Sequence, residues 1–317
     1  MISKTHIRLQ LMGKSAFSKA ASLLVFVHDE QKKREVAYEL FKALQTGESL
    51  EQLRTDELKL INGQSIKVDM INPHLTGADT SLNSELNHGY EPSVLTLLET
   101  YLPDNGVFYD VGANWGYFGF FTMLRPNFIG KIFSFEPMPI SIDSLHQVLE
   151  QMPDKERMII CPYALGDRVG NLPIIDSVWS GGCSMNGASQ SDLMVEVKRL
   201  DDLDLSKPDF IKIDVENFEA KVMRGACETI KNHRPYVIFE SWKSDDPEIT
   251  QAPIDLMKSL DYHLYVPRFN ALENRQYQLG EYVPGEVILD RIEDRNHINE
   301  IINIFAIPAE RDTDASR

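Results

Sequence analysis

Val107-Phe-Tyr-Asp-Val-Gly-Ala-Asn-Trp-Gly116 joins a short apolar run to a turn that holds two glycines. Its first five residues predict a buried strand, and residues 117–124 predict a helix that ends at Arg125-Pro126. A strand, a glycine turn and a helix in this order present backbone N–H groups and a helix N-terminus to a ligand. The segment therefore predicts a ligand-binding turn.

Strand and helix patterns alternate around this turn. The pattern predicts helices over 93–101, 141–151, 218–231 and 254–260, and strands over 131–135, 157–165, 210–215, 236–239, 262–266 and 303–307. Such alternation is typical of a doubly wound α/β fold with a parallel sheet. Residues 172–176 and 194–199 predict an inserted hairpin, and the loop from Ser180 to Ser191 is rich in Gly and Ser, so it could close over a substrate or simply be a surface loop.

The first 90 residues have a different pattern. They predict helices over 29–44 and 50–60 and a short strand over 65–71. We expect an N-terminal helical extension at 1–90, a Rossmann-like domain at 91–309 and a polar tail at 310–317. Basic residues precede the apolar run 20–27, which permits a targeting peptide but favours a basic helix packed on the domain.

Composition limits the partners. Lys and Arg number 32 against 48 Asp and Glu, a net charge of −16, which disfavours binding to nucleic acid or to anionic membranes. No run approaches the roughly 20 apolar residues of a membrane span. The cysteines Cys161, Cys183 and Cys227 lack metal-ligand spacing and suit a cytoplasmic protein. A homo-oligomer is left open.

The glycine turn favours one class of cofactor. A dinucleotide turn would have glycine where Asn114 stands, and Asp110 would repel a phosphate. S-adenosylmethionine has a sulfonium and an amino group and no phosphate, so it suits Asp110 better. The plainer alternative is an ordinary βα turn.

Glu136 supports a cofactor of some kind. It ends the next strand, roughly two dozen residues after Gly112, where an acidic residue binds ribose hydroxyls in nicotinamide, flavin and S-adenosylmethionine sites. Ala164, Leu165 and Asp167 follow the third strand, where they could frame an adenine. Asp167 could equally be a plain turn residue.

Five motifs together resemble the FkbM-type methyltransferases. They are Asp110–Gly116, Phe135–Pro137, Ala164–Asp167, Leu200–Leu203 and Asp209–Glu216, and the likeness covers about residues 90–241. The resemblance implies a class I, Rossmann-like fold with a mostly parallel seven-stranded sheet. It also implies S-adenosylmethionine as methyl donor and O-methylation of a hydroxyl on a sugar, polyketide or similar natural product. Where the family often has Glu-Gly, this chain has Glu216-Asn217, and Asn tolerates the left-handed conformation.

We expect Asp110, Gly112, Ala113, Asn114 and Gly116 to hold the methionine end of the donor. The catalytic candidates are Asp214, Glu216 and Glu240, which end the fourth and fifth parallel strands.

A carboxylate there can accept the proton of an acceptor hydroxyl. The alternative is a structural ion pair with Lys212 plus helix capping. Three carboxylates could hold a divalent cation, but we expect no metal. We expect His146, His233 and His263 to be structural, and His263 is the best placed of them if one is a catalytic base. A nicotinamide-dependent oxidoreductase and a non-catalytic donor-binding protein remain as alternative functions.

Overall fold

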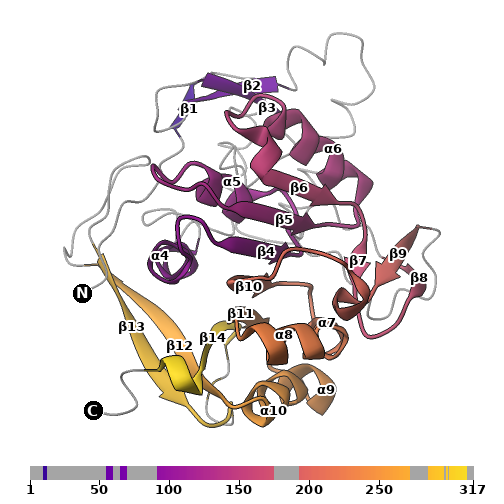
Figure 1. The fold of residues 1–317 in the computed structure, drawn as a ribbon, viewed down its shortest axis with the longest axis vertical. Coiled ribbons are helices and arrows are strands. Elements are labelled where there is room, and N and C mark those ends of the chain that lie inside the picture. The colour runs from indigo at the N-terminus through magenta and orange to yellow at the C-terminus, as the bar shows by residue number, and fades with distance from the viewer. Residues whose placement is uncertain are drawn as a thin grey trace, which may run out of the picture.

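The computed structural model describes residues 10–12, 55–59, 65–69, 91–174, 193–271, 285–295, 298 and 300–312. At its centre lies an eight-stranded sheet of order β13-β12-β14-β11-β10-β4-β5-β6 (Figure 1). The strands are β4 (Val107–Val111), β5 (Lys131–Phe135), β6 (Met158–Cys161), β10 (Phe210–Ile213), β11 (Tyr236–Ser241), β12 (Tyr262–Ala271), β13 (Gly285–Ile292) and β14 (Ile302–Pro308).

Neighbouring strands from β6 to β11 run parallel, and β14 lies antiparallel between β11 and β12. This arrangement confirms the class I α/β fold. The expected count of seven strands is wrong, because β12 extends to Ala271 and pairs antiparallel with β13. Residues 285–292 have an apolar and charged mixture that gave no strand signal of its own, so pairing with β12 decides their structure.

Helices cover both faces of the sheet. The structure has α4 (Pro92–Tyr101), α5 (Tyr117–Met123), α6 (Pro139–Leu149), α7 (Glu219–Gly225), α8 (Cys227–His233), α9 (Pro247–Thr250) and α10 (Ala252–Ser259), with short 3₁₀ turns η2 (Lys155–Arg157), η3 (Leu200–Asp202) and η4 (Ala309–Arg311). The helix predicted over 218–231 is divided in two at Ala226, where φ is −113°.

Alternation along the buried strands divides the core. Phe108 of β4 and Phe210 of β10 pack with α4, α5 and α6 in one cluster. Tyr109 and Ile211, one residue further along the same strands, pack with α7, α8 and α10 in a second cluster. Because parallel strands are buried on both faces, their sequence is apolar almost throughout.

A small sheet of order β7-β9-β8 contains the inserted hairpin. Its strands are β7 (Ala164–Leu165), β8 (Gly170–Pro173) and β9 (Met194–Lys198), and β8 and β9 pair antiparallel as predicted. The single strand predicted over 157–165 is wrong, because the chain leaves the main sheet after Cys161 and Pro162 offers no N–H to the ladder. The loop over 180–191 lies outside the described residues.

The described parts of the N-terminal extension are strands. β1 (Gln10–Met12), β2 (Thr55–Lys59) and β3 (Ser65–Asp69) form an antiparallel sheet (Figure 1). The helix predicted over 50–60 is therefore wrong at residues 55–59, because pairing with β1 and β3 outweighs local helix propensity. The helix predicted over 29–44 lies outside the described residues, and the domain boundary at residue 90 stays a prediction.

The extension packs on the main domain through β3. Ile66 is buried in the core cluster of α4, α5 and α6. The Lys67 N–H donates to Gln151 Oε1 at 2.7 Å, and Gln151 Nε2 donates to the Lys67 carbonyl at 2.7 Å. Over the residues that the structure describes, no helix is long and apolar enough to cross a lipid bilayer.

Candidate active site

The turn after β4 depends on two glycines in the left-handed region. Gly112 has φ of 80°, and a Cβ built there would lie 1.8 Å from the carbonyl oxygen of Asp214. Gly116 has φ of 79°, and its Cβ would lie 2.3 Å from Leu145 Cδ2. Both positions therefore require glycine. Asn114, with φ of 47°, occupies the same region, which Asn tolerates better than most residues.

Glu136 connects this turn to the end of β5 through hydrogen bonds. Its Oε2 accepts a hydrogen bond from the Asn114 N–H at 2.8 Å, and its Oε1 accepts one from the Met138 N–H at 2.8 Å. The residue is 5% exposed, and burial raises its pKa to about 7. The carboxylate keeps lone pairs for a further donor. Sequence spacing predicted the position of Glu136 but not this structural bond to the turn.

Asp110 is buried beneath α5. It is fully covered, and it lies in register with Lys212 on β10 and Ser134 on β5. Burial raises its pKa to about 6, although Lys212 acts in the opposite direction. Among the described residues neither carboxylate oxygen accepts a well-formed hydrogen bond, and the Gly119 N–H is the smallest of the influences on the pKa, which it lowers. Asp110 therefore faces the helix layer rather than the open edge of the sheet.

Lys212 carries a buried positive charge among carboxylates. Its Nζ lies 2.7 Å from Asp214 Oδ2 and 4.5 Å from the ring centroid of Phe118. Burial alone would lower the pKa of Lys212, but Asp214, Glu91 and Asp110 raise it above its ordinary value. The ion pair predicted between Lys212 and one of the strand-end carboxylates is present, and the Asp214 side chain remains 21% exposed.

Residues 214–219 form a tight turn from β10 into α7. Glu216 and Asn217 both have positive φ, 53° and 72°, so Asn217 does adopt the left-handed conformation expected of it. Burial, reinforced by Asp214, raises the pKa of Glu216 to about 7.

Glu219 belongs to the same turn and was not predicted. Its Oε1 accepts the Val215 N–H at 3.1 Å, it is 2% exposed, and burial raises its pKa to about 7. An acidic residue in the first turn of a helix was the available signal.

Glu240 is the residue before the last in β11, the strand that flanks β10 on the side opposite β4. Trp242 Nε1 donates to its Oε2 at 2.5 Å. Burial, followed by repulsion from Asp214, raises the pKa of Glu240 well above its ordinary value. Glu216 and Glu219 act on it in the same direction. The three predicted catalytic carboxylates, Asp214, Glu216 and Glu240, are thus close enough at the carboxyl edge to interact electrostatically.

The segment predicted to frame an adenine lies on the small sheet. Ala164 and Leu165 are buried in β7, and the Gly166 N–H donates to the Lys198 carbonyl at 2.9 Å. Asp167 lies 3.5 Å from Arg224 of α7, which gives it a structural partner. The structure does not bring Asp167 into the carboxylate cluster around Glu240, and its role at an adenine stays a prediction.

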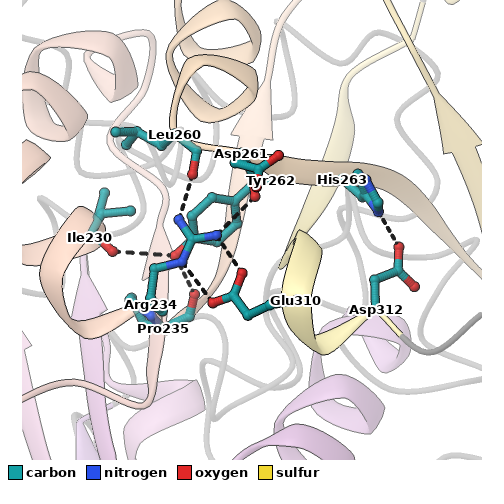
Figure 2. A network of polar contacts seen from close by, with 9 residues as sticks. All are labelled: Ile230, Arg234, Pro235, Leu260, Asp261, Tyr262, His263, Glu310 and Asp312. Atoms are coloured by element: carbon teal, nitrogen blue, oxygen red, sulfur yellow. Dashed lines mark hydrogen bonds and ion pairs between the residues drawn. The ribbon is translucent and has the colours of Figure 1, made fainter. Parts of the chain in front are cut away.

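His263 lies at the opposite end of the sheet. It pairs with Ile307 in β14, whereas Glu240 pairs with Asn303 near the start of that strand. Its Nδ1 lies 2.6 Å from Asp312 Oδ2 (Figure 2). His263 is therefore separated from the carboxylates, and the interpretation of it as a base has no support here. Within the described ranges, no group of three or more His, Cys, Asp or Glu side chains has metal-binding geometry.

Residues 110–267 match the family model of the Methyltransferase FkbM domain. The chain belongs to the FkbM methyltransferase family. A curated relative is the hexuronic acid methyltransferase AglP of Haloferax volcanii, which is 25% identical over 162 residues. That match covers 50% of this chain and 65% of AglP, so the chain spans less than two thirds of this relative.

Two methyltransferases are among the solved structures whose fold is similar to that of this chain. One is the methyltransferase FkbM of Methylobacillus flagellatus, with a TM-score of 0.44 and 16% identity over 74% of this chain and 52% of that one. The other is a SAM-dependent O-methyltransferase of Thermotoga maritima, with a TM-score of 0.36 and 12% identity over 82% of this chain and 79% of that one.

Proposed function

We propose that this chain transfers a methyl group from S-adenosylmethionine to a hydroxyl oxygen of a sugar. The observation that carries the proposal is the gathering of Asp214, Glu216 and Glu240 beside the glycine turn, at the edge where parallel sheets bind ligands. Family membership supports methyl transfer. The name of the relative AglP supports a sugar acceptor.

The residues present fit a sulfonium donor. Gly112 leaves bare backbone at the strand end, where a Cβ would collide with the Asp214 carbonyl. Glu136 keeps acceptor capacity for ribose hydroxyls. The surrounding carboxylates create a negative field, which favours a cation over a pyrophosphate. Because Asp110 is fully buried, we assign it to this field and to the support of the turn, with no direct contact to the donor.

S-adenosylmethionine, when bound, supplies an electrophilic methyl group. The chain must then align the acceptor hydroxyl and take its proton. Once ionised, Glu216 and Glu240 suit that task, because their raised pKa values make their carboxylates stronger bases than an exposed carboxylate. Asp214 is held in place by its ion pair with Lys212.

Calorimetry with S-adenosylmethionine tests the donor. We expect the wild type to bind and Glu136→Gln to bind at least about tenfold more weakly, because an amide cannot accept from the turn and the ribose together. Glu156→Gln removes the same charge from an exposed position and serves as the control. No binding by the folded wild type refutes the proposal, and protection by NADH instead would indicate an oxidoreductase.

Transfer itself is measured with donor labelled in the methyl group and a panel of sugars, followed by mass localisation of the label. Label on a sugar oxygen supports the proposal. Tight donor binding without transfer to any acceptor would instead identify a non-catalytic donor-binding protein.

A further inference from the structure

A cavity lies beside the carboxylate cluster, at the carboxyl edge of the sheet. Its volume is about 750 Å³, within the usual range of about 300–1,000 Å³ for ligand pockets. It is surrounded by the N-terminal end of α4, by residues 266–269 of β12 and residues 290 and 292 of β13, and by residues 298 and 300–303. None of the motifs in the chain pointed to this cavity.

Glu240 connects the cavity with the proposed transfer centre. It lines the cavity wall, and the neighbouring Asp214 adds to the rise in its pKa that burial causes. The backbone of Asp214 in turn packs against Gly112 in the cofactor turn. An acceptor in the cavity would therefore lie against Glu240.

The described residues that line the cavity are rich in acceptors. They include the carboxylates of Glu91, Glu240, Asp290 and Glu300. The single guanidinium among them, that of Arg268, is engaged by Asp290 from the neighbouring strand β13. Such a wall accepts hydrogen bonds from hydroxyl or amino groups and repels an anion.

Arg295 lies behind the wall. It is 3% exposed, and its Nη2 donates to the carbonyl of Glu300. Burial lowers the pKa of Arg295 and the nearby Glu240 raises it, so its positive charge acts on the wall from behind. Apolar side chains such as Phe269 and Ile302 complete the lining and offer a surface for the C–H face of a sugar ring.

We propose that this cavity binds the methyl acceptor and selects a sugar unit that carries hydroxyl or amino groups but no carboxylate. The proposal rests on the proposed function and departs from the relative named for hexuronic acid. Its physical basis is that a uronic acid would add a further carboxylate to a wall that already holds four among the described residues, where the one described lining guanidinium is paired.

Direct binding tests the selection without any methyl transfer. The methyl glycosides of glucose, galactose and mannose, their 2-amino-2-deoxy forms and their uronic acids are titrated into the full chain, with detection by ligand NMR. We expect at least one neutral or amino sugar to bind at least about tenfold more tightly than the matching uronic acid. Absence of binding by every sugar, or preference for a uronic acid, overturns the proposal.

Two variants assign the effect to the cavity. Asp290→Asn releases Arg268, so we expect the affinity for the uronic acids to rise about threefold or more. Glu156→Gln, with the same loss of charge outside the cavity, should leave every affinity unchanged. Equal effects of the two variants contradict the proposal. If a uronic acid binds to the wild type and Arg295→Gln abolishes that binding, Arg295 binds the carboxylate of the sugar. That result would also overturn the proposal.

The outcome is distinguishable from failure of the proposed function. Donor calorimetry decides whether S-adenosylmethionine binds, and sugar titration decides what the cavity takes. A chain that binds the donor but shows no cavity-dependent sugar binding retains the proposed function and loses this inference.

Discussion

At the scale of single residues, Gly112 determines how closely the glycine turn after β4 approaches β10. Replacing it with Ala places a Cβ against the Asp214 carbonyl in a backbone conformation that Ala disfavours. We expect Gly112→Ala to lower the free energy of unfolding by about 2–4 kcal/mol. Gly170→Ala is the matched control, because nothing lies within 4 Å of its Cβ, and it should change stability by less than about 1 kcal/mol. Equal urea midpoints for the two variants would contradict this account.

Glu240 is the residue whose chemistry is tested most directly. If it accepts the acceptor proton, Glu240→Gln lowers kcat by about 10²–10⁴-fold and leaves the donor Kd unchanged. Glu248→Gln is the control, since Glu248 pairs with Arg224 on the outer side of α7. Steady-state kinetics with the acceptor found in the sugar panel decides the matter. Full turnover by Glu240→Gln would show that Glu240 does not accept the proton. Glu216 would then be the candidate for that role, and the same measurement on Glu216→Gln would test it.

At the scale of elements, Arg234 joins α8, the start of β12 and the C-terminal turn η4 (Figure 2). Its Nη2 donates to the Asp261 carbonyl at 2.9 Å and to Glu310 Oε2 at 2.7 Å, and its guanidinium lies 4.5 Å from the Tyr262 ring centroid. Hydrogen bonding to Arg234 lowers the pKa of Glu310 to about 2. The network lies at the edge of the sheet opposite the carboxylates.

Arg234→Lys keeps the charge but loses the planar fork that serves several acceptors at once. We expect it to lower the free energy of unfolding by about 1–2 kcal/mol and to leave donor affinity unchanged. Arg291→Lys, at an exposed arginine 3.5 Å from Glu293, should change stability by less than about 0.5 kcal/mol. A loss of donor affinity in folded Arg234→Lys would show that the two edges of the sheet are coupled.

At the scale of the whole molecule, buried carboxylates make stability depend on pH. Burial raises the pKa of Glu136, Glu216 and Glu219 from 4.5 to about 7. Between these values the folded chain holds more protons than the unfolded chain, so stability falls as pH rises. Their contribution is complete below about pH 4.5 and is lost as pH passes about 7.

Urea unfolding of the donor-free chain should therefore give a lower free energy at pH 8 than at pH 5.5. Glu240→Gln should flatten this dependence, because it removes the group with the most strongly raised pKa of the cluster. The exposed Glu156→Gln should follow the wild type. A free energy that rises over this range would show that the cluster is ionised and compensated in the folded chain.

Much of the active-site outline could be predicted from sequence, because it follows from local order. A strand, a glycine turn and acidic residues at strand ends are read directly, and parallel strands necessarily place their carboxyl ends at one edge. Asn217 was expected in a left-handed conformation and adopts it. The position of Glu240 beside Asp214 needed only the order of two neighbouring strands.

Pairings between distant segments could not be predicted in the same way. β2 is a strand because β1 and β3 flank it, and β13 is a strand because β12 extends beside it. The same limit applies to Asp110, whose sequence position indicated a ligand contact but whose side chain lies under α5 opposite Lys212. The alternation of residues along a strand indicates which face each residue occupies, whereas tertiary packing determines what covers that face.

The sequence alone determined that this chain builds a glycine turn at the end of a central parallel strand, with carboxylates on the neighbouring strand ends. That outcome rests on short-range backbone geometry and strand alternation. Only the tertiary structure decided which carboxylates are buried, how Lys212 divides its charge among them, and that an acidic cavity adjoins Glu240. Those features depend on desolvation and charge proximity, which arise when α4, β12, β13 and residues 298 and 300–303 are brought together.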